Sequence, residues 1–148
     1  MEAPPSVAAS ILQGVGINRA DIQQLYESPS LGFVFEESTP VDGQPRAMGK
    51  SPDGLTCVEM IGSSSDLASV SLMVGVPNDA PRSRHETNAV LMLSLLKQAC
   101  PSWSGSSNWL SQNIGEAEKV ETIQCGKQLS IQNFKALSMI LLTVKPAI

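Results

Sequence analysis

The side chains with the most varied chemistry gather in one short segment, NDAPRSRHE, which follows an apolar run. Arg82 and Arg84 offer guanidinium donors, and His85 is the single histidine of the chain. Ser83 and Glu86 have the S-x-x-E spacing of a capping box, so a helix is predicted to begin here. Its free N–H groups and the arginines favour a small anionic ligand such as a carboxylate or phosphate. The candidate ligand-binding residues are Asn78, Asp79, Arg82, Arg84 and His85.

An alternative interpretation assigns this segment no ligand. In that interpretation the side chains of Ser83 and Glu86 already satisfy the N–H groups at the helix start, and the two arginines are solvated. A catalytic role for His85 is disfavoured, because the neighbouring arginines oppose the positive imidazolium that a general base must become. An anion site and a purely structural helix start are therefore both open.

The acidic residues and glycines form no recognisable catalytic or cofactor motif. Glu36 and Glu37 are adjacent in a predicted strand, so their side chains point to opposite faces and cannot act as a pair. No D-x-D-x-D-G loop indicates calcium, and Gly14-Val15-Gly16 lacks the rest of a dinucleotide-binding fingerprint. We therefore expect no cofactor and no metal, and we name no catalytic residue. The alternative is a small enzyme whose acidic residues or His85 converge only in the fold.

The three cysteines, Cys57, Cys100 and Cys125, are 43 and 25 residues apart, which matches no zinc-binding pattern. An odd number argues against a complete disulfide framework. We therefore predict three reduced and largely buried thiols, because free cysteine is among the most buried residue types. The alternative is a Cys57–Cys125 bridge, since both residues fall in predicted strands.

Two tryptophans, Trp103 and Trp109, flank the start of a short predicted helix. Packing in the core or at the helix cap accounts for them without a ligand, because indole rings bury a large apolar surface. The alternative is that an indole lines a groove between the helices and the sheet. Both residues are therefore named as candidate pocket-lining residues.

The composition is that of an acidic chain with enough apolar residues for one core. Of its 148 residues 42% are hydrophobic, and its formal net charge is −4. The ten basic residues are scattered, so we expect no nucleic-acid binding. No apolar run approaches the ~18 residues of a membrane span. Residues 1–16 lack signal-peptide features, so we expect a cytoplasmic protein by default, or an exported one if a leader preceded Met1.

Apolar periodicity and turn residues predict one helix, four strands, two helices and three strands. The clearest signal is the hairpin LTCVEMIG-SSSD-LASVSLMVGV, in which Val70, Leu72 and Val74 share one face. Asn18 is predicted to cap the first helix. The expected ranges are a helix over 18–27, strands over 31–38, 46–50, 55–62 and 67–76, helices over 83–99 and 107–114, and strands over 119–125, 129–133 and 137–144.

Two of these elements carry more specific expectations. The helix over 83–99 is the most apolar of the chain, and its predicted buried stripe comprises Ala89, Met92, Leu93, Leu96 and Cys100. The strand over 46–50 is polar and follows Pro45, which cannot donate a ladder hydrogen bond. That strand is therefore expected at or near a sheet edge.

Together these elements predict an α+β fold, with a mainly antiparallel sheet of about six to seven strands packed against the long apolar helix. Residues 1–16 are expected to form a flexible N-terminal arm, and residues 17–148 a single domain. The GFVF strand, and a strand-rich half followed by a long helix, resemble Mog1/PsbP-like domains. No diagnostic residue accompanies this likeness, and we take no family or function from it.

These observations predict a non-catalytic domain that binds a small ligand or a protein partner, as a monomer or a loose dimer. The alternatives are the small enzyme described above and a self-association or structural module that uses an exposed sheet edge. A deep pocket whose titratable groups have perturbed pKa values would favour the enzyme. A flat apolar patch would favour a protein partner.

Overall fold

The structure is a computed structural model that describes residues 14–77, 79, 81–114 and 118–147. A helix is followed by four strands, two helices and three more strands, with a short 3-10 turn before the last strand. The bounds are α2 Arg19–Tyr26, β1 Val34–Val41, β2 Gln44–Lys50, β3 Thr56–Ser63, β4 Asp66–Gly75, α3 Arg82–Ala99, α4 Ser106–Asn113, β5 Lys119–Gln124, β6 Lys127–Phe134, η1 Lys135–Leu137 and β7 Met139–Pro146.

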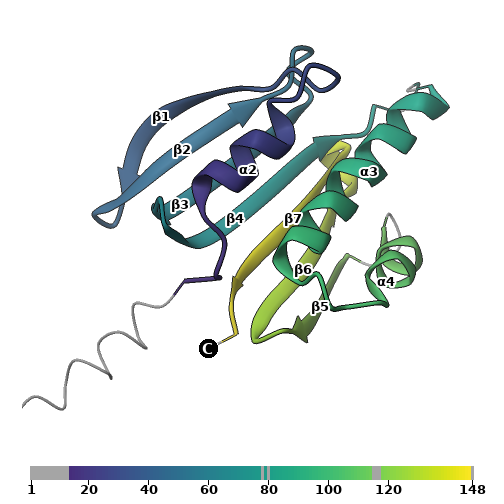
Figure 1. The fold of residues 1–148 in the computed structure, drawn as a ribbon. Helices are drawn as coiled ribbons and strands as arrows, with labels where there is room; N and C mark the ends of the chain where they lie inside the picture. The colour runs from purple at the N-terminus through teal and green to yellow at the C-terminus, as the bar shows by residue number, and fades with distance from the viewer. Residues whose placement is uncertain (1–13, 78, 80, 115–117, 148) are drawn as a thin grey trace, which may run out of the picture.

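The seven strands form one antiparallel sheet in the order β1-β2-β3-β4-β7-β6-β5 (Figure 1). The last strand of the chain, β7, lies between β4 and β6 and joins the meander β1–β4 to the hairpin β5–β6. Leu72 lies opposite Leu142, and Val74 lies opposite Ile140, so the apolar residues of the two central strands share a face. The prediction of an α+β fold with a mainly antiparallel sheet is confirmed.

The helices lie on one face of this sheet, and the core fills the space between the two layers (Figure 1). Ile22 of α2 and Leu95 of α3 are completely buried there, and each such side chain stabilises the fold by about 1.5–3 kcal/mol. The Tyr26 hydroxyl donates a hydrogen bond of 2.9 Å to the carbonyl oxygen of Leu91. The two helices are thus joined by a polar contact inside the core.

The two predictions about helix starts have different outcomes. Asn18 caps α2 as predicted, because its side-chain oxygen accepts a hydrogen bond of 2.8 Å from the backbone N–H of Asp21. The capping box predicted for α3 is wrong. The cap of α3 is Pro81, which has no side-chain hydrogen bond, and the first turn closes when Arg84 N–H donates to the Pro81 carbonyl at 2.9 Å. The predicted cap, Ser83, therefore lies inside the helix.

The buried face of α3 differs in part from the predicted stripe. Met92, Leu96 and Cys100 are buried as expected, but Ala89 and Leu93 are only half-buried. The buried residues of the helix are Asn88, Leu91, Met92, Leu95, Leu96 and Ala99. Apolar residues occupy more than one face of this helix, so helical periodicity alone does not decide which face meets the sheet.

The polar strand β2 pairs with both β1 and β3, so it is second from the edge of the sheet rather than at the edge. Pro45 falls at an irregularity in the pairing with β1, and the pairing with β3 begins only at Arg46. An internal strand tolerates the missing N–H there, because Pro45 has no paired residue in either neighbour. The edges of the sheet are β1 and β5.

The expected N-terminal arm falls mostly on residues 1–13, which lie outside the described residues. The remaining part, residues 14–16, belongs to the packed domain. The backbone N–H groups of Gly14 and Gly16 donate to the Asp66 carboxylate at 2.9 and 2.8 Å, and Val15 is buried. In the described part of the chain, no helix has the length and apolar character needed to cross a membrane.

Candidate functional site

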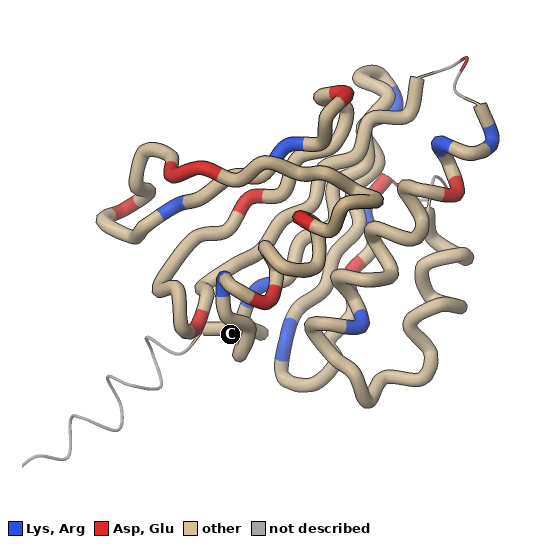
Figure 2. The backbone as a smooth tube through the Cα atoms, turned by 45° about the horizontal axis from the view of Figure 1, so that its top comes forward, with Lys and Arg blue, Asp and Glu red and all other residues tan. Residues whose placement is uncertain are grey.

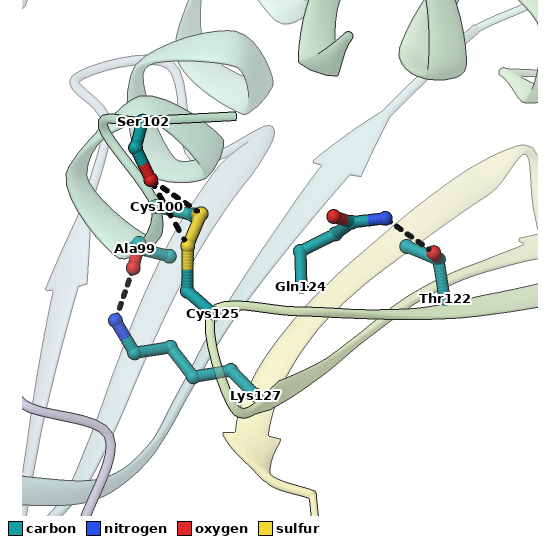
Figure 3. Close-up of a disulfide and its surroundings, with 7 residues drawn as sticks. All are labelled: Ala99, Cys100, Ser102, Thr122, Gln124, Cys125 and Lys127. Carbon is teal, nitrogen blue, oxygen red and sulfur yellow. Dashed lines mark hydrogen bonds between the residues drawn. A yellow bond between two sulfur atoms is a disulfide. The ribbon is translucent and has the colours of Figure 1, made fainter. Parts of the chain in front are cut away.

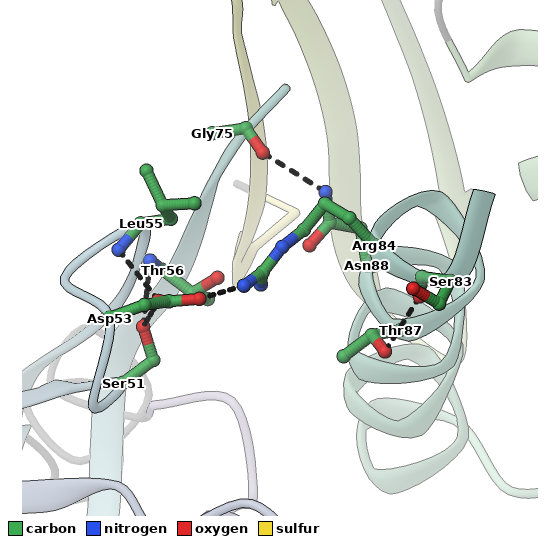
Figure 4. A network of polar contacts seen from close by, with 9 residues as sticks. All are labelled: Ser51, Asp53, Leu55, Thr56, Gly75, Ser83, Arg84, Thr87 and Asn88. Atoms are coloured by element: carbon green, nitrogen blue, oxygen red, sulfur yellow. Dashed lines mark hydrogen bonds and ion pairs between the residues drawn. The ribbon is translucent and has the colours of Figure 1, made fainter. Parts of the chain in front are cut away.

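The first turn of α3 is tied to the turn between β2 and β3 by an ion pair between Arg84 and Asp53 (Figure 4). The Asp53 carboxylate also accepts hydrogen bonds from the Ser51 hydroxyl at 2.6 Å and from the Leu55 N–H at 3.0 Å. Asp53 therefore organises its own turn and neutralises the arginine at the same time. This contact reduces the attraction that Arg84 can offer to a free anion.

One turn further along α3, Asn88 anchors the helix to the end of the sheet (Figure 4). Its side-chain amide donates a hydrogen bond of 3.1 Å to the carbonyl oxygen of Gly75, the last residue of β4. Asn88 is almost completely buried. The start of α3 is thus fixed to both the β2–β3 turn and the end of β4, so the surface between them is preorganised.

Two hollows open at this end of the sheet and share Leu55 and Pro77 in their walls. The first, which we call the polar hollow, has a volume of about 440 Å³ and is lined by Leu55, Pro77, Asp79, Pro81, Ser83, Arg84 and Thr87. The second, which we call the apolar hollow, has a volume of about 460 Å³. Its larger side chains are Leu55, Cys57, Met73, Val76, Leu137 and Met139.

Backbone hydrogen bonds hold the walls of the apolar hollow in place. Gly75 N–H donates to the Leu55 carbonyl, and Val76 N–H donates to the Ser138 carbonyl, each at 2.7 Å. A Cβ atom on Gly75 would come within 3.1 Å of the Leu55 carbonyl oxygen, so the close approach of these two backbone segments favours glycine here. The turn before β3 and the turn before β7 therefore stand on either side of the end of β4.

Several side chains of the apolar hollow are exposed although they are large and apolar. Leu137 is 65% exposed, Leu55 38% and Met73 37%. Cys57 lies directly opposite Met73 in the pairing of β3 with β4, on the sheet face that the described helices leave uncovered. Exposed apolar side chains that gather from separate elements are typical of interaction sites.

The structure brings together only part of the predicted anion site. Asp79 and Arg84 line the polar hollow, whereas Arg82 and His85 are exposed outside its lining. Asn78 lies outside the described residues. The candidate ligand-binding segment is therefore adjacent to a hollow, but its best-placed guanidinium is already paired.

The two tryptophans lie apart from both hollows. Their rings pack against each other with centroids 5.5 Å apart and a tilt of 54°, and both side chains contact the core. Neither Trp103 nor Trp109 belongs to the lining of the polar or the apolar hollow. This arrangement agrees with the packing interpretation of their role.

The residues of the apolar hollow were not among the candidate site residues named from the sequence. A signal was nevertheless present on β4. Val70, Leu72 and Val74 face the core, so the opposite face should carry polar residues, and Ser69 and Ser71 do. Met73 interrupts that polar face, and a large apolar residue at a solvent-facing position indicates a contact surface.

The thiol of Cys57 is the reactive group nearest to the apolar hollow, and its environment keeps it protonated. Burial raises the pKa of the Cys57 thiol above its ordinary value; the charge of Lys50 lowers that pKa and the charge of Glu59 raises it to lesser extents. A thiol is a weak nucleophile compared with a thiolate. Burial therefore makes Cys57, which lines the hollow, a weaker nucleophile than a solvent-exposed thiol.

The other two cysteines form a disulfide, which corrects the prediction of three free thiols (Figure 3). Cys100 follows the last residue of α3, and Cys125 occupies the tight turn between β5 and β6, with Cα atoms 5.9 Å apart. The Cys57–Cys125 alternative is also wrong, because Cys57 lies on β3 and is free. Lys127 adds a hydrogen bond to the carbonyl of Ala99, so helix and hairpin are joined twice.

This cross-link has the setting of a structural bond. Cys100 is buried at the C-terminal end of α3, where the helix dipole disfavours a negative thiolate. Cys125 and Gly126 form a two-residue turn in which both have positive φ angles, 56° and 73°. Such a turn normally favours Asn-Gly, because cysteine adopts a positive φ angle less readily than asparagine does. The disulfide thus holds Cys125 at this position of the turn.

Among the described residues, no three His, Cys, Asp or Glu side chains come together as a metal site requires. Comparison of the chain with models of protein families, with curated proteins and with solved structures finds no match.

Proposed function

We propose that this protein is a non-catalytic binding domain whose partner contacts the apolar hollow. The observation that carries this proposal is the convergence of Leu55, Met73 and Leu137, all exposed, from three separate elements at one end of the sheet. Covering such side chains removes apolar surface from water, which contributes about 25 cal/mol for each Å².

A protein partner fits this surface better than a small molecule does. Small-molecule sites enclose most of the ligand surface. The apolar hollow is bounded instead by exposed side chains, and it continues into the polar hollow across Leu55 and Pro77. An occupant that extends past the hollow, as a polypeptide does, gains contacts on both sides of that shared wall.

Two observations favour binding over chemistry at this end of the sheet. The pKa of the Cys57 thiol is raised by burial, which suppresses the thiolate that nucleophilic catalysis requires. Arg84 is held by Asp53, so its charge is committed to an internal contact. The Cys57 thiol is thus held in its less reactive form and the Arg84 guanidinium is paired.

The test is selection of a random peptide library, displayed on phage, against the disulfide-bonded protein. We expect selected peptides to lose binding at least about tenfold when Leu137 or Met73 is replaced by aspartate, because the charge prevents dry apolar contact. Val90→Asp is the matched control, since Val90 is 60% exposed on α3 and lies outside the lining of both hollows.

The outcome that would reject this function is equally specific. Peptides that bind both aspartate variants of the hollow as tightly as the natural protein would place the binding surface elsewhere. A selection that yields no binder to the natural protein would also count against it. Circular dichroism and thermal denaturation of each variant confirm that a loss of binding does not reflect unfolding.

A further inference from the structure

Exposed basic side chains near the apolar hollow form no ion pair within the described part of the chain. Lys50 lies opposite Cys57 in the pairing of β2 with β3, and Lys135 lies in η1, two residues before Leu137. Both lysines are exposed, and neither forms an ion pair with a described residue. Arg82, in the first turn of α3, is likewise exposed and unpaired within the described chain.

The carboxylates nearest to the hollow are mostly engaged. Asp53 is paired with Arg84, and Glu59 is paired with Arg46 across neighbouring strands, at 2.7 Å. Asp79, in the lining of the polar hollow, and Glu118, which lines a further hollow together with Lys135 and Leu137, oppose this pattern. Exposed basic residues therefore lie on two sides of an apolar surface on a chain whose net charge is −4. Figure 2 shows basic residues at the first turn of α3 and on neighbouring segments at the same end of the sheet.

The positions of the two lysines in the sheet limit what can contact both. Lys50 is on β2, whereas Lys135 is in the connection between β6 and β7, so β3 and β4 lie between them. Lys50 is in register with Gln132 of β6, four strand spacings away, and Lys135 lies three residues beyond Gln132. At about 4.8 Å per strand and about 3.3 Å per residue, the two lysines are roughly 20 Å apart. A single carboxylate cannot span that distance. Two carboxylates can do so when they lie about six residues apart on an extended chain, at about 3.3 Å per residue, because an even spacing also leaves both side chains on the same side of the chain.

We infer that the partner is an acidic protein segment, with apolar side chains that enter the apolar hollow and carboxylates on either side that contact Lys50 and Lys135. This inference rests on the proposed function and adds the chemistry of the partner to it. Complementary charge increases the rate of encounter and fixes the register of the segment, while the apolar side chains supply most of the affinity.

The experiment uses the same displayed peptide library with the natural protein and with two variants of equal charge. Lys50→Glu/Lys135→Glu reverses the charge beside the hollow. Lys97→Glu/Lys145→Glu changes the net charge equally at exposed lysines on α3 and β7 that are outside the lining of the hollow. We expect aspartate and glutamate to flank the apolar residues of peptides that are selected by the natural protein or by the control variant. In peptides selected by Lys50→Glu/Lys135→Glu, we expect lysine or arginine at those flanking positions.

A synthetic peptide from the selection, labelled with a fluorophore, then provides the affinity. Reversal of the two lysines should weaken its binding about tenfold or more, the control variant less than about twofold, and raising the salt concentration should weaken binding to the natural protein. Decanoate serves as a competitor with one carboxylate and an apolar chain. Displacement of the peptide by decanoate at a similar concentration would overturn the assignment to an acidic protein segment.

Different experimental outcomes would reject this inference and the proposed function. Peptides that require Leu137 and Met73 but carry no acidic residues would leave the binding domain in place and overturn the acidic partner. Peptides that are indifferent to aspartate at Leu137 and Met73 would reject the binding surface itself. Acidic peptides that bind Lys50→Glu/Lys135→Glu unchanged would also overturn the inference.

Discussion

The Arg84 guanidinium, at the start of α3, forms an ion pair with the Asp53 carboxylate in the turn between β2 and β3. This contact joins two segments that are 31 residues apart in the sequence, from Asp53 to Arg84. It also reduces the attraction that Arg84 can offer to an anion, since Asp53 already balances its charge.

Removal of Asp53 should therefore lower stability slightly and improve anion binding. The side chains of Arg84 and Asp53 are 21% and 38% exposed, so solvent screens the pair, and Asp53→Ala should reduce the free energy of unfolding by about 1 kcal/mol or less. Thermal shifts with added sulfate measure the second effect. We expect a larger shift for Asp53→Ala than for the natural protein, and equal shifts would show that Arg84 is not the limiting anion contact.

Thiol counting tests the disulfide directly. The protein unfolded without reductant should react at one thiol, that of Cys57, and at three after reduction. Cys100→Ser/Cys125→Ser should lower the free energy of unfolding by about 3 kcal/mol, because the bond closes a loop of about 25 residues. Three reactive thiols without reductant would contradict the cross-link.

The core prediction concerns Leu96, which is completely buried between α3 and the sheet. Leu96→Ala should lower the free energy of unfolding by about 2–5 kcal/mol, because it removes buried methyl groups and leaves a cavity. Val90→Ala, on the exposed side of the same helix, is the control and should change stability by less than about 0.5 kcal/mol. Urea titration of both variants measures the difference, and similar losses would mean that the helix packs differently.

The single tyrosine of the chain makes stability depend on alkaline pH. Burial raises the pKa of the Tyr26 hydroxyl above its ordinary value of 10.0. A group whose pKa is higher in the folded than in the unfolded state contributes stability below its unfolded pKa, and that contribution is lost as pH rises. Stability should thus fall by about 1.4 kcal/mol per pH unit above pH ~10.

Tyrosinate absorbance provides the measurement for Tyr26. The folded protein should show no tyrosinate signal at pH ~11, whereas the unfolded protein should show most of it. Tyr26→Phe should remove this part of the pH dependence, although it also loses the hydrogen bond to Leu91. Ionisation of the folded protein near pH 10 would mean that the hydroxyl is accessible to water.

Alkylation of Cys57 tests the electrostatic environment of the apolar hollow. The Lys50 charge lowers the pKa of this thiol and the Glu59 charge raises it. Lys50→Ala should therefore slow the reaction with iodoacetamide at neutral pH, and Glu59→Gln should accelerate it, since the rate follows the thiolate fraction. Rates that do not differ in these directions would show that neither charge acts on the thiol.

The sequence by itself determined much of the local structure. Alternation with a period of two in β4 places Val70, Leu72 and Val74 on the buried face, and the Asp42–Gly43 turn appears between β1 and β2, with positive φ angles of 50° and 78°. The Asn18 cap also follows from neighbouring residues alone. These features depend on interactions within a few residues, which a linear pattern records.

Only the tertiary structure decided which distant segments meet. The insertion of β7 between β4 and β6 brings Leu137 and Met139 beside Met73 and creates the apolar hollow, while the α3–α4 layer and the β5–β6 turn bring Cys100 to Cys125. The apolar periodicity and the secondary-structure propensities of the sequence are equally compatible with other strand orders and with a Cys57–Cys125 pair. The physical reason is that period and capping are local, whereas strand order and cysteine pairing are selected by burial of the whole core.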